Sequence, residues 1–349
     1  MVEAVAVDNG YAPSNLLLQW HITERCNLRC HHCYQDNYAR DELPFDTLLT
    51  ILEQFKTLLN TLRQRAGQFI RGHITVTGGE PFARQDFLDL LNIFAQYHEQ
   101  FSFAILTNST LIDATLAQQL ALLKPAFIQV SIEGDEKIHD EIRGKGNFQQ
   151  VVTAIKYLHH AKIPTYISFT AHRQNFRSFP KVAQLANKLK VEKVWADRLI
   201  PCGTGANAQS LTPDETKQFF ELMYQTQQSS NWLKKTSPVS MQRALQFLIA
   251  DGKPYDCKAG DSLITLQPNG DIYPCRRLPI RVGNILENTL LDIYDNCSLF
   301  HKLRNPEQIN QGCEHCFYAK ACRGGLKCLS YAVTGDPFQR DPGCWLKNS

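Results

Sequence analysis

Short apolar runs alternate with amphipathic stretches over the first two thirds of the chain. Six of these runs are rich in Ile, Val, Phe and Leu and are almost continuously apolar, as strands buried on both faces are. They predict strands at residues 15–21, 73–77, 101–107, 126–132, 164–170 and 193–200.

Helical patterns occupy the intervals between these runs. In residues 45–64, apolar side chains recur every three or four positions, which is the spacing of one helix face. Similar stripes lie at residues 86–98, 113–123, 147–160 and 178–189. Alternating strands and helices form βαβ units with parallel strands and right-handed crossovers. The sequence therefore predicts the α/β class, with an open or partial (β/α)6 barrel over residues 14–210 after a lead-in of residues 1–13.

The pattern changes after residue 210. Residues 213–229 and 239–250 are predicted as helices, the first with Thr212 as its N-cap, and both belong to a helical linker over residues 211–256. From residue 257 to 349 the chain is loop-rich and dense in cysteine. Because such a segment cannot bury a large core, we expect a separate domain held together by metal.

Composition narrows the function classes. The chain has 349 residues, and 37 basic against 34 acidic side chains give a net charge of +3, too small to indicate a nucleic-acid or membrane partner. A bilayer-spanning apolar run and a signal peptide are both missing from the sequence, which favours the cytoplasm. In that reducing compartment, twelve cysteines are expected to bind metal or act as catalytic thiols rather than form disulfides.

The first cysteine group follows the first predicted strand. Cys26, Cys30 and Cys33 are spaced Cys-x3-Cys-x2-Cys, and three thiolates suit three irons of a [4Fe–4S] cluster while the fourth iron stays open for catalysis. In a parallel α/β barrel, the loop after a strand lies at the end where active sites are built. A zinc site completed by His31 or His32 is the alternative.

This cysteine spacing, followed by Tyr34, resembles the signature of the radical S-adenosylmethionine (SAM) superfamily. Further motifs occur in that family's order at successive strand ends. The resemblance implies a SAM site made of Tyr34, of Gly78, Gly79 and Glu80 in GGEP, of Asn108 in LTNS, of Ser131 in QVSIEG, of Arg143 in EIRGKG and of Ile200 in RLIP. It implies that the GGEP segment holds the SAM amino group, that Ser131 and Arg143 contact ribose and carboxylate groups, and that Ile200 packs on the adenine.

The second cysteine group resembles the SPASM extension of radical SAM enzymes, which holds two auxiliary [4Fe–4S] clusters. The resemblance implies one cluster bound by Cys313, Cys316, Cys322 and Cys344, and a second bound by Cys257, Cys275 and Cys328. The second set has no fourth cysteine at a matching position, and Asp261 is the nearby carboxylate. Five residues rather than the family's three separate Cys322 from Cys328. A zinc-ribbon-like binding module is the alternative.

Three residues outside these groups affect the interpretation. Arg276 stands where sulfatase-maturating relatives carry the aspartate that acts as base, which argues against formylglycine formation. Cys202, just past the sixth predicted strand, has three readings: a catalytic hydrogen-atom donor to a substrate radical, a ligand of an auxiliary cluster, or a small packed side chain. Cys297, on a predicted helix, is expected to be structural.

The resemblance implies an enzyme with SAM and three [4Fe–4S] clusters that forms a 5′-deoxyadenosyl radical and abstracts a hydrogen atom. We expect it to mature a ribosomally made peptide through a thioether or carbon–carbon crosslink, with a flavodoxin- or ferredoxin-type electron donor. The short lead-in predicts either a separate leader-binding protein or direct docking of the peptide. The alternatives are a peptide epimerase that uses Cys202, a small-molecule radical oxidoreductase, and a non-enzymatic iron–sulfur carrier or zinc-bound scaffold.

Overall fold

The computed structural model describes residues 11–35, 37–38, 42–231, 238–250 and 252–346. The first ten residues of the predicted lead-in lie outside this part. The chain divides into two compact units, and each is assembled from three separate segments. The first unit comprises residues 1–26, 37–104 and 258–308, and the second comprises residues 27–36, 105–257 and 309–349.

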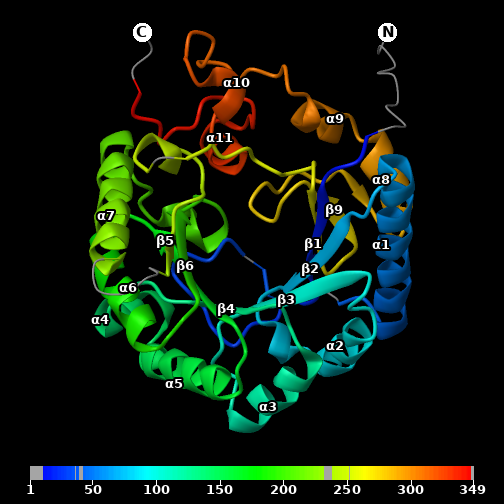
Figure 1. Ribbon diagram of the computed structural model, residues 1–349, viewed down its shortest axis with the longest axis horizontal. Coiled ribbons are helices and arrows are strands. Elements are labelled where there is room, and N and C mark those ends of the chain that lie inside the picture. Colours follow the sequence, from blue (N-terminus) through cyan, green and yellow to red (C-terminus); the bar gives the residue numbers. More distant parts are fainter. Residues whose placement is uncertain (1–10, 36, 39–41, 232–237, 251, 347–349) are drawn as a thin grey trace. The chain divides into compact units, whose positions relative to one another are not determined.

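The strands of the first unit come from both ends of the chain (Figure 1). They are β1 (Asn15–His21), β2 (Arg71–Thr77), the first half of β3 (Phe101–Thr107), β8 (Leu263–Leu266), β9 (Asp271–Tyr273) and β10 (Gly283–Asn284). β1 pairs in parallel with β2 on one side and with β8 on the other. β9 pairs antiparallel with β8 and β10. Part of the cysteine-rich region thus extends a parallel sheet, which the sequence did not predict.

The helices of the first unit are α1 (Phe45–Ala66), α2 (Phe87–Ala95), α8 (Leu290–Asn296) and α9 (Ser298–Arg304), with a 3₁₀ turn at Pro81–Ala83. α1 buries the apolar face that its periodicity predicted, including Leu52 and Phe55. In the last turn of α1, Arg65 binds both carboxylate oxygens of Asp295 in α8, at 2.7 and 2.6 Å. This ion pair holds the late helix α8 beside α1 (Figure 1).

The second unit contains the second half of β3, then β4 (Ile128–Ser131), β5 (Thr165–Ala171), β6 (Lys193–Arg198) and β7 (Val239–Ser240). Each strand pairs in parallel with the next. Their carboxyl ends therefore meet at one edge of the sheet.

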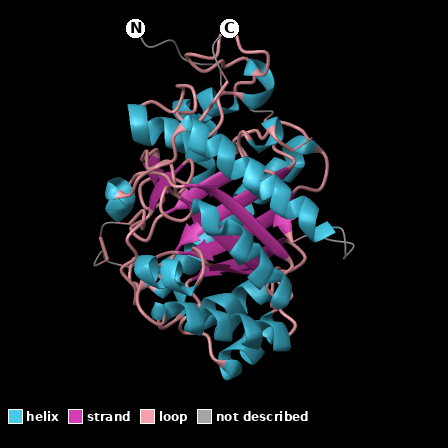
Figure 2. Ribbon diagram, turned by 90° about the vertical axis from the view of Figure 1, so that its left-hand side faces the viewer, coloured by secondary structure: helices cyan, strands magenta, loops and turns pink. Residues whose placement is uncertain are grey.

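The helices of this unit are α3 (Ala114–Leu123), α4 (Glu136–Arg143), α5 (Asn147–His160), α6 (Phe179–Lys188), α7 (Pro213–Asn231), α10 (Ala319–Cys322) and α11 (Lys327–Thr334). Short 3₁₀ turns occupy Phe176–Ser178, Gly203–Asn207 and Gln246–Leu248. Within each unit, helices lie outside the strands (Figure 2). None of the helices that the structure describes is both long enough and apolar enough to cross a bilayer.

The six predicted strands and the helices between them are confirmed, as is the α/β class with a parallel sheet. The predicted cap of α7 is also confirmed: the backbone N of Glu215 donates to Thr212 Oγ1 (3.2 Å), and the backbone N of Thr212 donates to Glu215 Oε2 (2.9 Å). These reciprocal bonds form a capping box.

The predicted helix over residues 239–250 is wrong. Val239 pairs with Val194 as part of β7, and Leu245 has a φ of 69°, which no right-handed helix accommodates. Cys297 does not lie within a helix either, because it ends α8 and caps the start of α9. The loop-rich description of the C-terminal region gave bounds for none of its short helices, among them α8, α9 and α11 at seven or eight residues each.

Candidate cofactor site and cysteine groups

The loop that carries Cys30 and Cys33 lies in the second unit, against the segment that follows β6. The backbone N of Gly205 donates to the Cys33 carbonyl (2.8 Å), and Thr204 Oγ1 donates to the Gln35 carbonyl (2.8 Å). A Cβ atom at Gly203 would lie 2.2 Å from the Tyr34 carbonyl oxygen, and Gly203 has a φ of 57°. Glycine is therefore required where residues 203–205 approach this loop.

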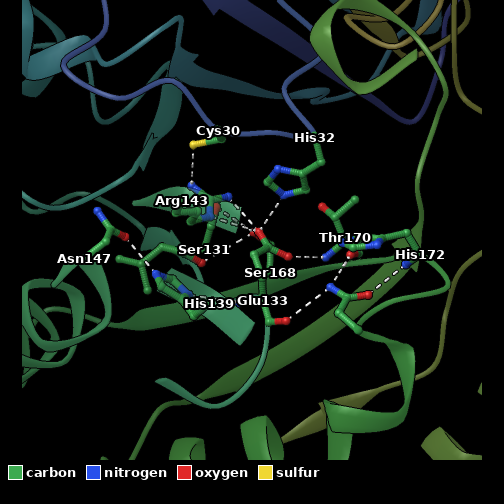
Figure 3. Close-up of polar contacts among 12 residues, drawn as sticks. Cys30, His32, Ser131, Glu133, His139, Arg143, Asn147, Ser168, Thr170 and His172 are labelled. Atoms are coloured by element: carbon green, nitrogen blue, oxygen red, sulfur yellow. Dashed lines mark hydrogen bonds and ion pairs between the residues drawn. The ribbon is translucent and has the colours of Figure 1, made fainter. Parts of the chain in front are cut away.

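Glu133 is the centre of a buried polar network at the ends of β4 and β5 (Figure 3). Its side chain is 1% exposed. The carboxylate accepts hydrogen bonds from Arg143 Nε (3.1 Å) and Nη2 (2.7 Å), from His32 Nε2 (3.0 Å) and from the backbone N of Thr170 (2.9 Å). Burial alone raises the pKa of Glu133, but His32, Arg143 and these hydrogen bonds outweigh burial and hold the pKa well below its usual range. Glu133 is therefore a carboxylate that only accepts hydrogen bonds.

Arg143 connects this network to the cysteine loop. It is the last residue of α4, and its Nη1 lies 3.9 Å from Cys30 Sγ. Burial raises the pKa of the Cys30 thiol, and the charge of Arg143 opposes that effect. The sequence predicted Arg143 as a SAM residue but did not identify Glu133 or the role of His32. An acidic residue at the end of an apolar strand was the signal available for Glu133.

Three other residues of the predicted SAM site also lie at strand ends of the second unit. Ser131 Oγ is 3.3 Å from Ser168 Oγ in the neighbouring strand. Asn108 Nδ2 donates to Asn27 Oδ1 (2.8 Å), which ties the end of β3 to the start of the cysteine loop. Ile200 is 6% exposed, and its carbonyl accepts a hydrogen bond from the backbone N of Cys202 (2.9 Å).

The GGEP segment lies in the first unit, directly after β2. The backbone N of Gly79 donates to the Thr23 carbonyl (2.9 Å), and the backbone N of Glu80 donates to the Arg25 carbonyl (2.8 Å). A Cβ at Gly79 would lie 2.4 Å from the Arg25 carbonyl oxygen, so this close approach excludes a side chain. Glu80 is fully buried, and its Oε1 accepts from the backbone N of Phe82 (3.2 Å). The segment that precedes Cys26 is thereby fixed.

Four cysteines of the second group surround one cavity in the second unit. Cys313, Cys316, Cys322 and Cys344 line it, together with Arg340 and apolar side chains such as Phe247 and Leu248. Its volume is about 70 Å³, several times the roughly 10–15 Å³ that one water needs on this measure. Four thiols around a space of this size fit an iron–sulfur cluster.

Burial keeps two of the thiols that line this cavity protonated until a metal binds. Burial raises the pKa of Cys313 to about 11 and that of Cys322 to about 12. These thiols therefore become thiolates by losing their protons to metal binding. Arg340 Nη2 lies 3.6 Å from Cys344 Sγ, where it donates toward a ligand sulfur.

The remaining predicted ligands fall in different units. Cys26 and Cys275 belong to the first unit, whereas Cys257 and Cys328 belong to the second, and the predicted Cys257–Cys275–Cys328 set stays a prediction. Asp261 accepts hydrogen bonds from the Tyr11 hydroxyl and from Lys258 Nζ (3.2 Å). Among the residues that the structure describes, no three His, Cys, Asp or Glu side chains converge on a single metal-ion position.

Two family models match the chain. The radical SAM superfamily model matches residues 20–186, and the SPASM iron–sulfur cluster-binding domain model matches residues 257–317. The chain belongs to the radical SAM superfamily. It is an enzyme of the SPASM subfamily within that superfamily.

Relatives of this radical SAM enzyme have different named activities. An AdoMet-dependent heme synthase of Methanosarcina barkeri is 28% identical over 346 residues, covering 94% of this chain and 95% of the relative. The mycofactocin maturase MftC of Mycolicibacterium smegmatis is 29% identical over 347 residues, covering 94% and 82%. A crystal structure of Streptococcus suis SuiB bound to S-adenosylmethionine superimposes with a TM-score of 0.74 at 20% identity, covering 95% of this chain and 77% of SuiB. This last similarity concerns the fold.

Membership of the superfamily implies [4Fe–4S] clusters and SAM as cofactors. In the second unit, two sets of cysteines of this radical SAM enzyme fit such cofactors. Cys30 and Cys33 are half-buried free thiols, with the Arg143 cation beside the first. The cavity lined by Cys313, Cys316, Cys322 and Cys344 supplies four thiols in one place.

Proposed function

We propose that this enzyme cleaves SAM reductively, abstracts a hydrogen atom from an organic substrate and takes up one electron from the substrate radical through an auxiliary cluster. One observation carries the proposal: Glu133 holds the Arg143 cation 3.9 Å from Cys30 Sγ at the carboxyl ends of parallel strands. When bound, the cluster of the first cysteine group supplies the electron that splits the sulfonium. We propose three clusters in total, ligated by the cysteines predicted above.

The chain's own side chains bind and orient SAM. Arg143 offers the charge and the donors that a carboxylate requires, and Ser131 offers a hydroxyl for the ribose. Ile200 presents an apolar side chain to the adenine. Tyr34, Gly78, Gly79, Glu80 and Asn108 complete the proposed site.

Formation of 5′-deoxyadenosine tests this activity. The anaerobically reconstituted, dithionite-reduced protein is mixed with SAM, and the nucleoside is quantified by chromatography. We expect 5′-deoxyadenosine from the wild type and none from Cys30→Ser or Cys33→Ser. Cys297→Ser, which changes a thiol outside both groups, serves as control and keeps the activity. A reduced wild type that makes no 5′-deoxyadenosine would instead be an electron carrier or scaffold.

We propose a ribosomally made peptide as substrate, in which a thioether or carbon–carbon crosslink forms. The maturase relative at 29% identity supports this substrate class. The crosslink removes two hydrogen atoms from the peptide: one leaves as the abstracted atom, and the other leaves as a proton and an electron. Incubation with a precursor peptide, and with a leader-binding protein where one exists, is expected to lower the peptide mass by two hydrogen atoms. We further propose a cytoplasmic location and a flavodoxin- or ferredoxin-type electron donor.

A heme-type macrocycle is the second candidate substrate, within the class of small-molecule radical oxidoreductases. The supporting observation is the heme synthase relative, which is matched over 95% of its length. Turnover of an iron porphyrin without any peptide, followed by mass spectrometry of the macrocycle, would favour this candidate over the peptide.

Cys202 is proposed as a hydrogen-atom donor, the role that a peptide epimerase needs. It is half-buried and directly precedes Gly203, the residue packed on the Tyr34 carbonyl. In deuterated water, an epimerase places deuterium at a substrate Cα, and Cys202→Ala stops this. Full activity of Cys202→Ala, or no deuterium at Cα, rejects the role.

A further inference from the structure

Lys327 is a buried lysine at the start of α11. It is 2% exposed, and it is the first residue of the helix, where the helix dipole disfavours a cation. Its Nζ donates to Asn310 Oδ1 (2.5 Å) and to the Arg323 carbonyl (3.0 Å), and it lies 5.1 Å from the centroid of the Phe338 ring. Both acceptors are neutral oxygens. A cation that is buried on neutral partners is costly, so its position points to an anion bound nearby.

The charged groups around Lys327 include thiols of the second cysteine group. Burial lowers the pKa of Lys327 to about 8, against the opposing charges of Cys257, Asp256 and Cys313. Asp256 is itself paired with Arg323, whose Nη1 lies 3.1 Å from Oδ1. The cysteines are therefore the anionic groups near Lys327 that have metal to bind.

Both hydrogen-bond acceptors of Lys327 are joined to the cavity that four cysteines line, which we call the four-cysteine cavity. The carbonyl of Asn310 accepts a hydrogen bond from the backbone N of Cys313 (3.0 Å), and Arg323 directly follows Cys322. Cys313 and Cys322 are two of the cysteines that line this cavity. Asn310 is fully buried, which limits its freedom to move. The ammonium group is thus fixed by the two segments that carry these thiols.

A fixed cation affects a cluster in this cavity through its oxidation state. A [4Fe–4S] cluster bound by four thiolates has a net negative charge, and reduction adds one electron to that charge. A nearby cation stabilises the reduced form more than the oxidised form, so it raises the reduction potential. Because Lys327 is buried, salt and water screen its charge much less than they screen a surface lysine.

We propose that Lys327 raises the reduction potential of the cluster in the four-cysteine cavity through its buried positive charge. This inference rests on the proposed function, in which an auxiliary cluster takes up one electron from the substrate radical. A higher potential makes the cluster a better acceptor of that electron. Lys327 acts in this role only through the cluster and is a positioning residue rather than a catalytic one.

A redox titration of the reconstituted holoenzyme, followed by electron paramagnetic resonance, tests this assignment. The signal that Cys316→Ser removes belongs to the four-cysteine cavity, and the signal that Cys30→Ser removes belongs to the first cysteine group. We expect Lys327→Met to lower the midpoint potential of the cavity signal by about 59 mV, which is a tenfold change in a one-electron equilibrium. The midpoint of the first group's signal stays unchanged. Lys320→Met, at an exposed position of α10, is the matched control and shifts neither signal.

A second variant separates the charge of Lys327 from its hydrogen bonds. Lys327→Gln keeps a donor for the neighbouring oxygens and loses the charge. We expect it to lower the midpoint potential of the cavity signal as much as Lys327→Met does. A wild-type potential in Lys327→Gln would show that the hydrogen bonds suffice, which overturns the inference.

An unchanged midpoint in Lys327→Met, or an equal fall for the first group's signal, also overturns it. Iron content establishes that each variant is loaded. If the Met and Gln variants both lose the cluster, Lys327→Arg decides: a retained cluster with the wild-type potential supports the inference, and loss of the cluster in all three variants overturns it. A wild type that binds no auxiliary iron, or that makes no 5′-deoxyadenosine, refutes the proposed function itself, which separates the two failures.

Discussion

Arg198 and Asp341 form a two-point ion pair in which Nη1 lies 2.7 Å from Oδ1 and Nη2 lies 2.8 Å from Oδ2. Both side chains are 1% exposed. Arg198 ends β6, and Asp341 precedes Cys344 by three residues. The same carboxylate accepts hydrogen bonds from the backbone N of Leu326 (2.9 Å) and of Gly343 (2.8 Å). One acidic side chain thus fixes the segment that leads to Cys344 to the sheet of the second unit.

Removing Asp341 is expected to destabilise the second unit strongly. Asp341→Ala leaves the Arg198 cation buried without its partner, a change that costs about 3–5 kcal/mol. Thermal unfolding under anaerobic conditions is expected to show a lower midpoint, together with a lower iron content. Arg198→Met combined with Asp341→Leu is expected to recover part of the loss, because apolar side chains can replace a buried pair. A double variant less stable than Asp341→Ala would contradict this explanation.

Serine substitutions are expected to distinguish the roles of the two cysteine groups. Cys316→Ser removes one thiol from the four-cysteine cavity, so the iron content falls by one cluster's share while SAM cleavage continues. Cys30→Ser removes the cluster that SAM cleavage needs and leaves the auxiliary iron in place. Iron and sulfide analysis with electron paramagnetic resonance of the reduced protein distinguishes the two losses. Loss of SAM cleavage in Cys316→Ser, or loss of more than one cluster's iron in either variant, would show that the groups are not independent.

Gly203 is expected to tolerate no side chain. At its φ of 57°, a residue with a β-carbon is destabilised by about 1 kcal/mol relative to glycine. That β-carbon would also lie 2.2 Å from the Tyr34 carbonyl oxygen. Gly67 is a matched control, because its φ is 61° and a Cβ there meets nothing within 4 Å. Gly203→Ala should therefore lower the thermal midpoint and the iron content more than Gly67→Ala. Equal effects would mean that backbone conformation alone requires glycine at position 203.

His73 is expected to make stability depend on pH. Burial lowers its pKa to about 4, with a smaller effect of Arg71, and its Nδ1 lies 2.8 Å from Ser102 Oγ. Between pH 6 and pH 5 the unfolded ring binds a proton and the folded ring does not, so the free energy of unfolding falls as the pH falls. His73→Gln should reduce this slope by about one proton, or about 1.4 kcal/mol per pH unit. An unchanged slope between pH 6 and pH 5 would show that His73 titrates alike in both states.

Local sequence patterns predicted the strands and helices whose own residues show a clear apolar run or periodicity. β1 and β3 begin and end where their apolar runs do, because a strand buried on both faces needs no further context. β7 and β8 were missed, since their pairing with β6 and β1 depends on residues far away in the sequence.

The residues of the candidate site also fall into those that the sequence predicted and those that only the structure revealed. Cysteine spacing and the family motifs identified the thiols and Arg143. The contacts of Glu133 with His32 and of Arg198 with Asp341 join segments that no local window contains. Spacing along the chain therefore predicts candidate ligands, whereas the buried charges that hold them emerge only from the folded unit.

The stretch from Arg198 to Gly205 contacts both cysteine groups of the second unit: Arg198 through Asp341, and Gly205 through the Cys33 carbonyl. Oxygen from the air attacks the iron of either cluster. Loss of either cluster then removes support from the same eight residues, 198–205. Limited proteolysis is therefore expected to cut first within residues 198–205, whichever cluster is lost.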